Sequence, residues 1–253
     1  MKKRKVLVVG NWKMNPVTLP EAKTLFAKVK RTARGFRNTE IVLCPPFVFL
    51  NSLVGGTVRL GAQDAFWQNG GRFTGEISPE ILKNLGVSYC LVGHSERRAI
   101  GETDEVVSKK VNAVLRESIK AVVCIGERER DSSGGYFEFL RDQIKRSLAG
   151  VPPRFLSDLI VAYEPIWAIG KSFRDSMSPA DIRETSIFIR KVLSDIYDRT
   201  AAASIPIIYG AAVEPENVAA VLQEGGVAGV LVGHKSLEAE DFIAIIKSAN
   251  EIK

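Results

Sequence analysis

The feature that most constrains the fold of this chain is a short apolar run that recurs eight times along its 253 residues. Most of these runs lack the alternation of apolar and polar residues that marks a half-exposed strand, so they are typical of parallel strands buried on both faces. The runs are KVLVVGNW (5–12), IVLCPP (41–46), VRLGAQD (58–64), YCLVGH (89–94), KAVVCIGE (120–127), LIVAYEP (159–165), IPIIYG (205–210) and AGVLVGH (228–234).

Amphipathic segments typical of helices lie between these runs. In LPEAKTLFAKVKRTA (19–33), Leu25, Phe26 and Val29 fall on one stripe at helical spacing. Two further segments carry helix start signals, because SPADIRETSIFIRKVLSDIY (178–197) and SPEILKNLG (78–86) both open on Ser-Pro. We expect the serine to cap the helix and the proline to occupy its first turn, and we expect Gly86 to end the second helix.

Strand and helix therefore alternate eight times, in about the length expected of an α/β protein with a (β/α)8 barrel. No shift in composition and no linker divides the chain, so we expect a single barrel domain over 1–253. A doubly wound open sheet is the alternative. Such a sheet usually has fewer strands for this length, and the first strand–helix turn here lacks a Gly-rich dinucleotide fingerprint.

The net charge of +6 fits an anionic substrate or partner, and it fits equally well a basic surface with no specific role. Nucleic-acid binding has only this charge in its favour, so we expect no nucleic-acid partner. Cys44, Cys90 and Cys124 each lie in or beside an apolar run, which indicates buried thiols rather than a disulfide framework. No Cys/His cluster has the spacing of metal ligands, so we expect no metal.

The N-terminal MKKRKVLVVG imitates the charged region of a signal peptide. Its apolar run is too short, NWKMN interrupts it, and no small-residue cleavage site follows, so we expect no targeting segment. No apolar stretch approaches the length that crosses a membrane. These features favour a cytoplasmic protein with no membrane partner.

In a (β/α)8 barrel the active site lies at the carboxyl ends of the strands, so polar residues there are candidates. The first run ends on Asn11 and Lys13, the fourth on His94 and the sixth on Glu164. An ammonium, an imidazole and a carboxylate would then surround one pocket. Taken singly, Lys13 could be a solvated lysine, His94 a core histidine and Glu164 half of a structural ion pair, but their convergence favours function.

Next to His94, Ser95 has the character of an N-cap that opens a helix over SERRAI. A helix N-terminus disfavours an additional positive charge, so we expect His94 to stay neutral and to donate a hydrogen bond. A neutral imidazole, an ammonium and a carboxylate suit proton transfer next to a carbonyl group. The carboxylate would remove a carbon-bound proton, and the other two groups would stabilise the oxyanion.

Five motifs together resemble the triosephosphate isomerase family, and they occur in the family's order over nearly the whole chain. They are GNWKMN (10–15), FTGE (73–76), VGHSERR (92–98), CIGE (124–127) and AYEPIWAIG (162–170). The resemblance implies the interconversion of dihydroxyacetone phosphate and D-glyceraldehyde 3-phosphate through an enediolate, without a cofactor. The neutral histidine is itself a known property of this family.

The resemblance also implies roles for particular residues. Glu164 would be the base and His94 the neutral electrophile, while Lys13 stabilises negative charge and Asn11 and Glu96 line the site. The segment PIWAIG, which follows Glu164, resembles the start of the family's lid, which excludes water and protects the intermediate.

The sequence departs from the family pattern around the phosphate. The lid region Lys171–Ser178 is about two residues longer, Ala211-Ala212 stand in the loop YGAA, and His234-Lys235 stand in VGHKS. Because backbone N–H groups hold phosphate in this family, Gly170, Ala212, Gly233 and His234 remain candidate phosphate-binding residues. The third run ends on AQD, where the family commonly has AQN, which puts an additional carboxylate at Asp64.

The segment AFWQNGGRFTGE (65–76) implies an assembly, since by resemblance it inserts into a partner subunit and brings Thr74 near the neighbour's Asn11 and Lys13. We therefore expect a homodimer, with an ordinary surface loop as the alternative. Two alternatives to an active isomerase also stay open, namely a phosphate-binding barrel without turnover and a different phosphate-handling barrel lyase.

Overall fold

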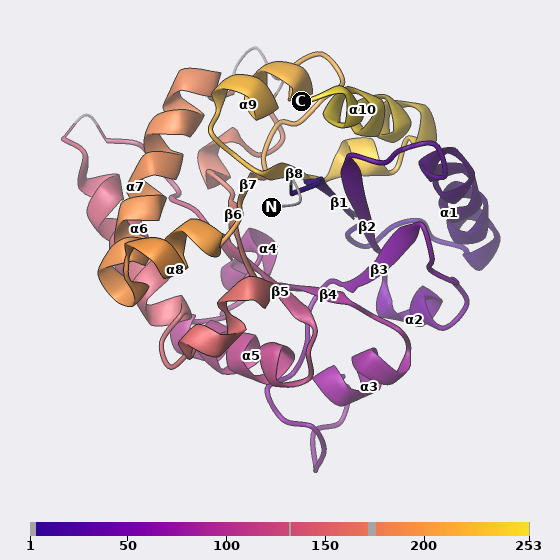
Figure 1. The fold of residues 1–253 in the computed structure, drawn as a ribbon. Coiled ribbons are helices and arrows are strands. Elements are labelled where there is room, and N and C mark those ends of the chain that lie inside the picture. Colours follow the sequence, from indigo (N-terminus) through magenta and orange to yellow (C-terminus); the bar gives the residue numbers. More distant parts are fainter. Residues whose placement is uncertain (1–3, 132, 172–175, 253) are drawn as a thin grey trace.

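The computed structural model describes residues 4–131, 133–171 and 176–252, and in it the eight strands close into one parallel barrel in the order of the chain (Figure 1). Each strand pairs with the next, and β8 returns to β1 with Val230 opposite Val8. The predicted (β/α)8 barrel is therefore confirmed. The strands are β1 (Val6–Asn11), β2 (Thr39–Cys44), β3 (Val58–Ala62), β4 (Tyr89–Val92), β5 (Lys120–Ile125), β6 (Leu159–Tyr163), β7 (Ile207–Tyr209) and β8 (Gly229–Val232).

Helices surround the barrel in the view along its axis (Figure 1). The α-helices are α1 (Leu19–Ala33), α2 (Phe47–Leu50), α3 (Pro79–Asn84), α4 (Ser95–Ala99), α5 (Asp104–Arg116), α6 (Gly135–Ser147), α7 (Pro179–Tyr197), α8 (Arg199–Ser204), α9 (Val218–Glu224) and α10 (Ala239–Glu251). Short 3₁₀ turns occur at η1 (Pro153–Asp158), η2 (Ile166–Ala168) and η4 (His234–Ser236). Within the described ranges, no helix is both long enough and apolar enough to cross a membrane.

The predicted helix boundaries follow from local hydrogen bonds. Ser178 accepts from the N–H of Asp181 at 3.2 Å and caps α7, and Ser78 caps α3 in the same way. Gly86 follows the last turn of α3 with φ of +79°, a conformation that glycine adopts without steric cost. There the N–H of Val87 reaches back to the carbonyl of Leu82 at 3.0 Å, which closes a Schellman motif.

The predicted apolar stripe of α1 is confirmed. Phe26 and Val29 are buried against the barrel, and Ala22 and Ala33 complete the buried stripe. Leu25 is half-buried and packs against the same core at the edge of the stripe. The exposed remainder of the helix is largely charged, as in other amphipathic helices that cover a sheet.

The strands bury both faces, as their apolar sequences predict. One set of side chains fills the inside of the barrel, among them Val9, Leu91 and Ile208, and the other set packs against the helices. The three cysteines are free thiols and all are buried, with Cys44 and Cys124 inside the barrel. Burial raises the pKa of each thiol well above its ordinary value, so none of them is a ready nucleophile.

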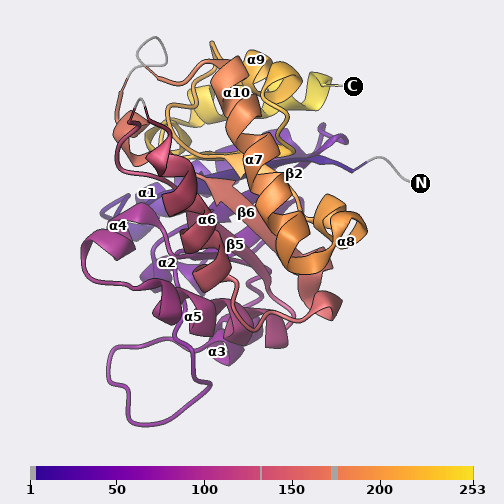
Figure 2. The same ribbon diagram turned by 90° about the vertical axis from the view of Figure 1, so that its left-hand side faces the viewer.

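The barrel has two different ends. Figure 1 is viewed from the amino-terminal mouth, and Figure 2, turned by 90°, shows the carboxyl ends of the strands on its left. The purple loop between β3 and α3 projects from the molecule on that side (Figure 2). This loop contains the segment 65–76, and its residues 68–76 are exposed.

Candidate active site

Glu164 stands directly after β6, and its backbone is fixed on both sides. Its N–H donates to the carbonyl of Ile125 at 2.7 Å, which continues the pairing of β6 with β5. Gly126 lies so close to the Glu164 carbonyl that any Cβ at position 126 would collide with it. The Glu164 side chain is only 5 % exposed, so a carboxylate is held out of water at the end of a strand.

His94 follows β4 and faces Glu164, with its Nε2 atom 3.4 Å from Oε1 of Glu164. We expected Ser95 to cap the following helix, and this was wrong. The cap of α4 is His94 itself, whose Nδ1 accepts from the N–H of Glu96 at 3.2 Å. A nitrogen that accepts carries no proton, so a neutral ring in this position carries its proton on Nε2, the atom that faces Glu164.

Lys13 adopts φ of +52°, which is uncommon for a residue with a side chain. Its N–H donates to Oδ1 of Asn11 at 2.9 Å. Gln63, just after β3, donates from Nε2 to the carbonyls of Lys13 at 2.7 Å and Cys44 at 2.9 Å. These bonds hold the strained backbone, and the Lys13 ammonium lies 2.6 Å from Oε1 of Glu96.

Sequence reasoning missed Gln63 and Glu127, and both carried a usable signal. Gln63 stands in AQD at the end of the third run, where a polar residue was already a candidate by position. Glu127 ends the fifth run and is 1 % exposed. It accepts from the Tyr163 hydroxyl at 2.8 Å and from Nε1 of Trp167 at 2.9 Å, so it ties η2, the start of the predicted lid, to β6.

The side chains of Lys13, His94 and Glu164 share a narrow pocket at the carboxyl end of the barrel. Its lining contains five of the predicted site residues. The other four were not among them, although Ile169, Gly210 and Ala211 stand in the lid segment and the YGAA loop that the sequence analysis identified. The lining residues are Asn11, Lys13, His94, Glu164, Ile169, Gly210, Ala211, Leu231 and Gly233. Glu96 contacts the pocket through Lys13, whereas Gly170, Ala212 and His234 do not line it.

The loop after β8 is one of the loops around the pocket that depart from the family pattern. After β8, Gly233 leads into the turn η4, in which the N–H of Ser236 bonds to the Gly233 carbonyl at 2.8 Å. The first N–H groups of such a turn have no acceptor within it. His234 is exposed, and Lys235 pairs with Asp241 at 2.7 Å, a hydrogen bond that raises the pKa of Lys235.

Only the two ends of the lid region are described, since 172–175 lie outside the described residues. At the first end, Ile166–Ala168 form a single 3₁₀ turn, and the ammonium of Lys171 lies 5.2 Å from the Trp167 ring centre. At the second end, the Ser176 and Tyr209 hydroxyls are 3.2 Å apart. The predicted extra length therefore falls largely on residues of which the structure says nothing.

Comparison with known proteins identifies relatives of the whole chain. The family model for triosephosphate isomerase matches residues 6–249. A protein named triosephosphate isomerase from Dehalococcoides mccartyi (strain ATCC BAA-2266 / KCTC 15142 / 195) is 41 % identical, with 99 % of each chain covered. Proteins of the same name from Moorella thermoacetica and Dictyoglomus turgidum are 41 % and 36 % identical, over 96 % and 97 % of this chain and 98 % and 100 % of theirs.

Proposed function

The chain belongs to the triosephosphate isomerase family, and we propose that Glu164, His94 and Lys13 carry out its reaction, the interconversion of dihydroxyacetone phosphate and D-glyceraldehyde 3-phosphate. One observation carries this assignment. The Nε2 atom of His94 and Oε1 of Glu164 are 3.4 Å apart in a pocket that Lys13 also lines. A base and two hydrogen-bond donors thus converge on the space where a carbonyl and its neighbouring carbon would lie.

The carboxylate of Glu164 takes the proton from the carbon next to the substrate carbonyl. Its Oε2 atom is buried and has no hydrogen-bond partner among the described residues, so this lone pair is available to the substrate. Burial also keeps water from competing for the carboxylate. The same carboxylate then returns the proton to the adjacent carbon, while the hydroxyl proton passes from one substrate oxygen to the other, so the enzyme ends the cycle in its original state.

The negative charge that develops on oxygen is met by His94 and Lys13. With Nδ1 occupied by the Glu96 N–H, the imidazole donates from Nε2 to both oxygens of the enediolate in turn. Lys13 supplies a full positive charge, and the pair with Glu96 holds its ammonium at the pocket wall. We therefore assign Glu96 a supporting role, in which it orients Lys13.

The substrate phosphate would lie against the backbone N–H groups around η4 and the Gly210–Ala212 turn. Gly233 lines the pocket, and a Cβ at this position would contact the Lys13 side chain. We retain Gly170, Ala212 and His234 as phosphate-binding candidates through their backbone, with Gly170 contributing once the lid closes over the substrate. No metal or cofactor enters this scheme.

We further propose that the whole chain forms one barrel domain and acts in the cytoplasm as a homodimer. The exposed residues of 65–76 would insert into the partner. Large apolar side chains that are unusually exposed support such an interface, because isolated proteins rarely leave so many uncovered. They include Met14 at 90 %, Val48 at 80 % and Ile100 at 78 %.

An assay of the purified chain with D-glyceraldehyde 3-phosphate, coupled to reduction of dihydroxyacetone phosphate, tests the function. We expect turnover that saturates with substrate. Phosphate binding without turnover would instead identify a binding protein, and release of inorganic phosphate or a cleaved product at the rate of substrate loss would identify a lyase.

A further inference from the structure

A second hollow lies at the amino-terminal mouth of the barrel, at the opposite end from the pocket of Glu164. Pairing of β2 with β3 begins only at Ile41 and Val58, so the chain segments before these residues separate. The hollow lies in this fork and has a volume of about 370 Å³. That volume is within the range of pockets that hold small molecules, which is roughly 300–1,000 Å³.

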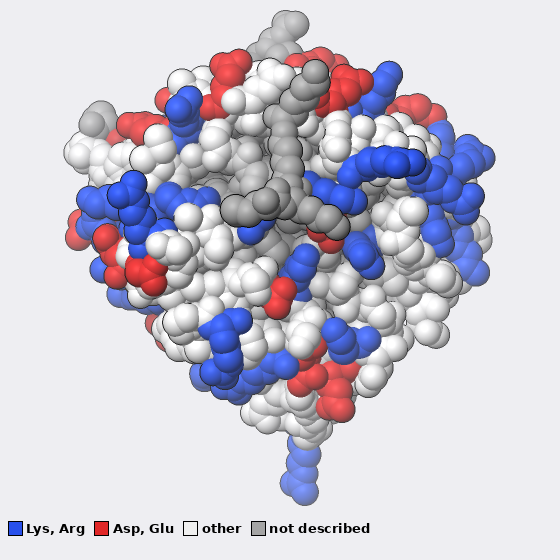
Figure 3. All heavy atoms as spheres, viewed as in Figure 1, with Lys and Arg blue, Asp and Glu red and all other residues white. Residues whose placement is uncertain are grey.

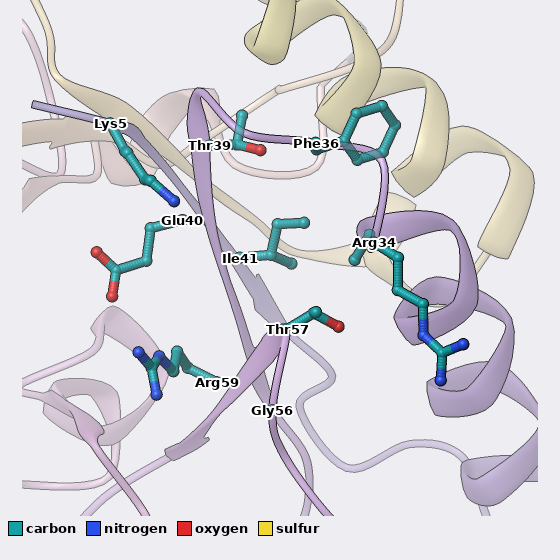
Figure 4. Close-up of a pocket in the computed structure, with 10 residues that line it drawn as sticks. Lys5, Arg34, Phe36, Thr39, Glu40, Ile41, Gly56, Thr57 and Arg59 are labelled. Atoms are coloured by element: carbon teal, nitrogen blue, oxygen red, sulfur yellow. The ribbon is translucent and has the colours of Figure 1, made fainter. Parts of the chain in front are cut away.

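The walls of the hollow carry more positive than negative charge. Lys5, Arg34 and Arg59 line it, and Glu40 is its single carboxylate. In Figure 4, Lys5, Glu40 and Arg59 lie on one side of β2, while Arg34 lies on the other side, toward α1. Figure 3 views the molecule from this end and shows Lys and Arg side chains around the mouth, with Asp and Glu side chains between them.

Glu40, the single carboxylate of the hollow, is already paired with Lys120, which does not line the hollow. The ammonium of Lys120 lies 3.8 Å from Oε1 of Glu40 and also donates to the Tyr89 hydroxyl at 3.0 Å. Among the described residues, none of the ion pairs includes Lys5, Arg34 or Arg59. The hollow therefore keeps an excess of positive charge that an anion would neutralise.

A buried hydroxyl provides a second, independent sign of a ligand. Thr39, the first residue of β2, is 5 % exposed, and its Oγ1 has no hydrogen-bond partner among the described residues. The residue lines the hollow on the side of Phe36 and Arg34 (Figure 4). Burying a hydroxyl without a partner is unfavourable, and an anion in the hollow could accept its hydrogen bond.

The remaining wall on this side is apolar. Phe36 and Ile41 line it, with the ring of Phe36 next to Thr39 (Figure 4). A ligand that pairs with the cations and also covers the apolar wall has one strongly charged group and one carbon portion. Three cations against one carboxylate favour a group that carries two negative charges.

We propose that this hollow binds a small organic phosphate, at a site separate from the isomerase pocket. The phosphate group accepts from the Thr39 hydroxyl. Arg34, whose guanidinium points away from Thr39 in Figure 4, attracts it at longer range, and so do Lys5 and Arg59 from the other side of β2. The carbon portion packs on Phe36 and Ile41. Binding here stabilises the amino-terminal mouth of the barrel, because a ligand that binds only the folded state shifts unfolding to higher temperature.

Amide NMR spectra of the full chain, titrated with phenyl phosphate and separately with inorganic phosphate at constant ionic strength, test the site. We expect saturable shifts of the Thr39 and Thr57 amides, with tighter binding of phenyl phosphate because its ring packs on Phe36. Shifts at Gly210 and Gly233 report the isomerase pocket independently. Absence of saturable shifts at Thr39 and Thr57 with both probes would overturn the proposal.

Three variants identify the groups involved. Thr39→Val should weaken phenyl phosphate binding at least about tenfold, or ~1.4 kcal/mol, because it removes the direct donor, and Arg34→Gln should weaken it several-fold. Arg37→Gln removes the same charge from an exposed neighbour that does not line the hollow, and should change binding less than about twofold, or ~0.4 kcal/mol. Equal weakening by Arg34→Gln and Arg37→Gln would reject the site, because it would mean that the positive surface charge as a whole attracts the phosphate.

Thr39→Val also separates binding from folding. Without phosphate its melting temperature should equal or exceed that of the parent, since an unpaired buried hydroxyl is removed. With phenyl phosphate the parent should gain thermal stability and the variant should gain much less. An equal gain in the two proteins would show that the Thr39 hydroxyl does not contact the ligand.

Discussion

At the scale of single residues, the chemistry depends on how hydrogen bonds leave particular atoms unoccupied. Nδ1 of His94 is occupied by the Glu96 N–H, which directs the proton of the neutral ring to Nε2 and toward Glu164. Oε2 of Glu164 is buried without a partner among the described residues. In the proposed reaction, a base and a donor would thus be directed at the same space before any substrate arrives, which would lower the reorganisation that the reaction requires.

Glu164→Gln tests the base. The amide has nearly the same shape but cannot take a proton, so we expect kcat to fall at least about 10³-fold, since general-base catalysis contributes roughly 10²–10⁴-fold. Binding of a substrate-like phosphate, followed by calorimetry, should persist. Glu138→Gln, which removes an exposed carboxylate from α6, is the matched control. Near-normal turnover of Glu164→Gln would remove Glu164 from this role.

Asp64, where the family commonly has Asn, belongs to a buried charge network beneath the 65–76 loop. Both of its oxygens accept from Lys110, at 2.8 and 2.7 Å, and Nε of Arg97 lies 2.8 Å from Oδ2. Lys110 also contacts Glu102, so two carboxylates and two cations share the site. Burial raises the pKa of Asp64 above its ordinary value, although Lys110 and Arg97 act in the opposite direction.

Asp64→Asn should therefore change how stability depends on pH. A carboxyl group whose pKa is raised on folding contributes stability below its unfolded pKa, and loses this contribution as pH rises through the folded value. In Asp64→Asn, Lys110 keeps Glu102 and an amide oxygen as partners. We expect the free energy of unfolding of the variant to improve relative to the parent as pH rises from about 4 to about 7, a range set by the ordinary Asp pKa of about 3.9.

Urea unfolding at several pH values measures this difference. Asp142→Asn, at an exposed position on α6, serves as the control and should leave the pH dependence unchanged. A variant that instead loses stability relative to the parent with rising pH would show that the ion pair with Lys110 outweighs desolvation of Asp64.

At the scale of elements, the carboxyl ends of the strands and the turns after them form the site. η4 begins directly after Gly233 at the carboxyl end of β8, and the His234 side chain is exposed. Lys235 pairs with Asp241 at the start of α10. The two departures from the family pattern in this loop therefore leave the turn itself in place.

His234→Gly, which restores the common family residue, should then change kcat/KM by less than about tenfold, or ~1.4 kcal/mol. The reason is that, in the proposed site, a backbone N–H of residue 234 would bind phosphate whatever side chain the residue carries. Measurements of kcat/KM for His234→Gly and His234→Ala between pH 6 and 8 decide this. A loss above about a hundredfold in both variants, ~2.7 kcal/mol, would mean that the imidazole itself holds the phosphate.

At the scale of the whole molecule, the loop that contains 65–76 stands out because it takes no part in closing the barrel. The N–H of Phe66 bonds to the Ile77 carbonyl at 2.8 Å and closes the base of the loop, and the Phe66 and Phe73 rings pack at 4.6 Å. The loop is thus ordered by its own contacts and projects beyond the helices (Figure 2). Such a preformed projection suits insertion into a second copy.

We expect a symmetric dimer in which Thr74 approaches the partner's Asn11 and Lys13. Thr74→Arg should shift the population toward a less active monomer, because an additional cation would face a partner lysine. Light scattering and activity over a dilution series measure both properties. Thr24→Arg, at an exposed position on α1, is the control. A fully active monomer at micromolar concentration would contradict the assembly.

The sequence by itself determined the barrel and the positions from which the site is built. Eight apolar runs of strand length, separated by amphipathic segments, leave few other folds, because a strand buried on both faces needs helices on one side and other strands on the other. The same pattern predicted that Lys13, His94 and Glu164 meet, since each follows a strand end and parallel strands end on one face of a barrel.

The tertiary structure alone decided how these residues are oriented. That His94 rather than Ser95 caps α4 depends on where the imidazole turns relative to Glu164, a residue of another strand. The support of Lys13 by Gln63 joins positions 50 residues apart in sequence. Periodicity reports which face of an element is buried, whereas such contacts exist only once barrel closure brings distant strand ends within hydrogen-bonding distance.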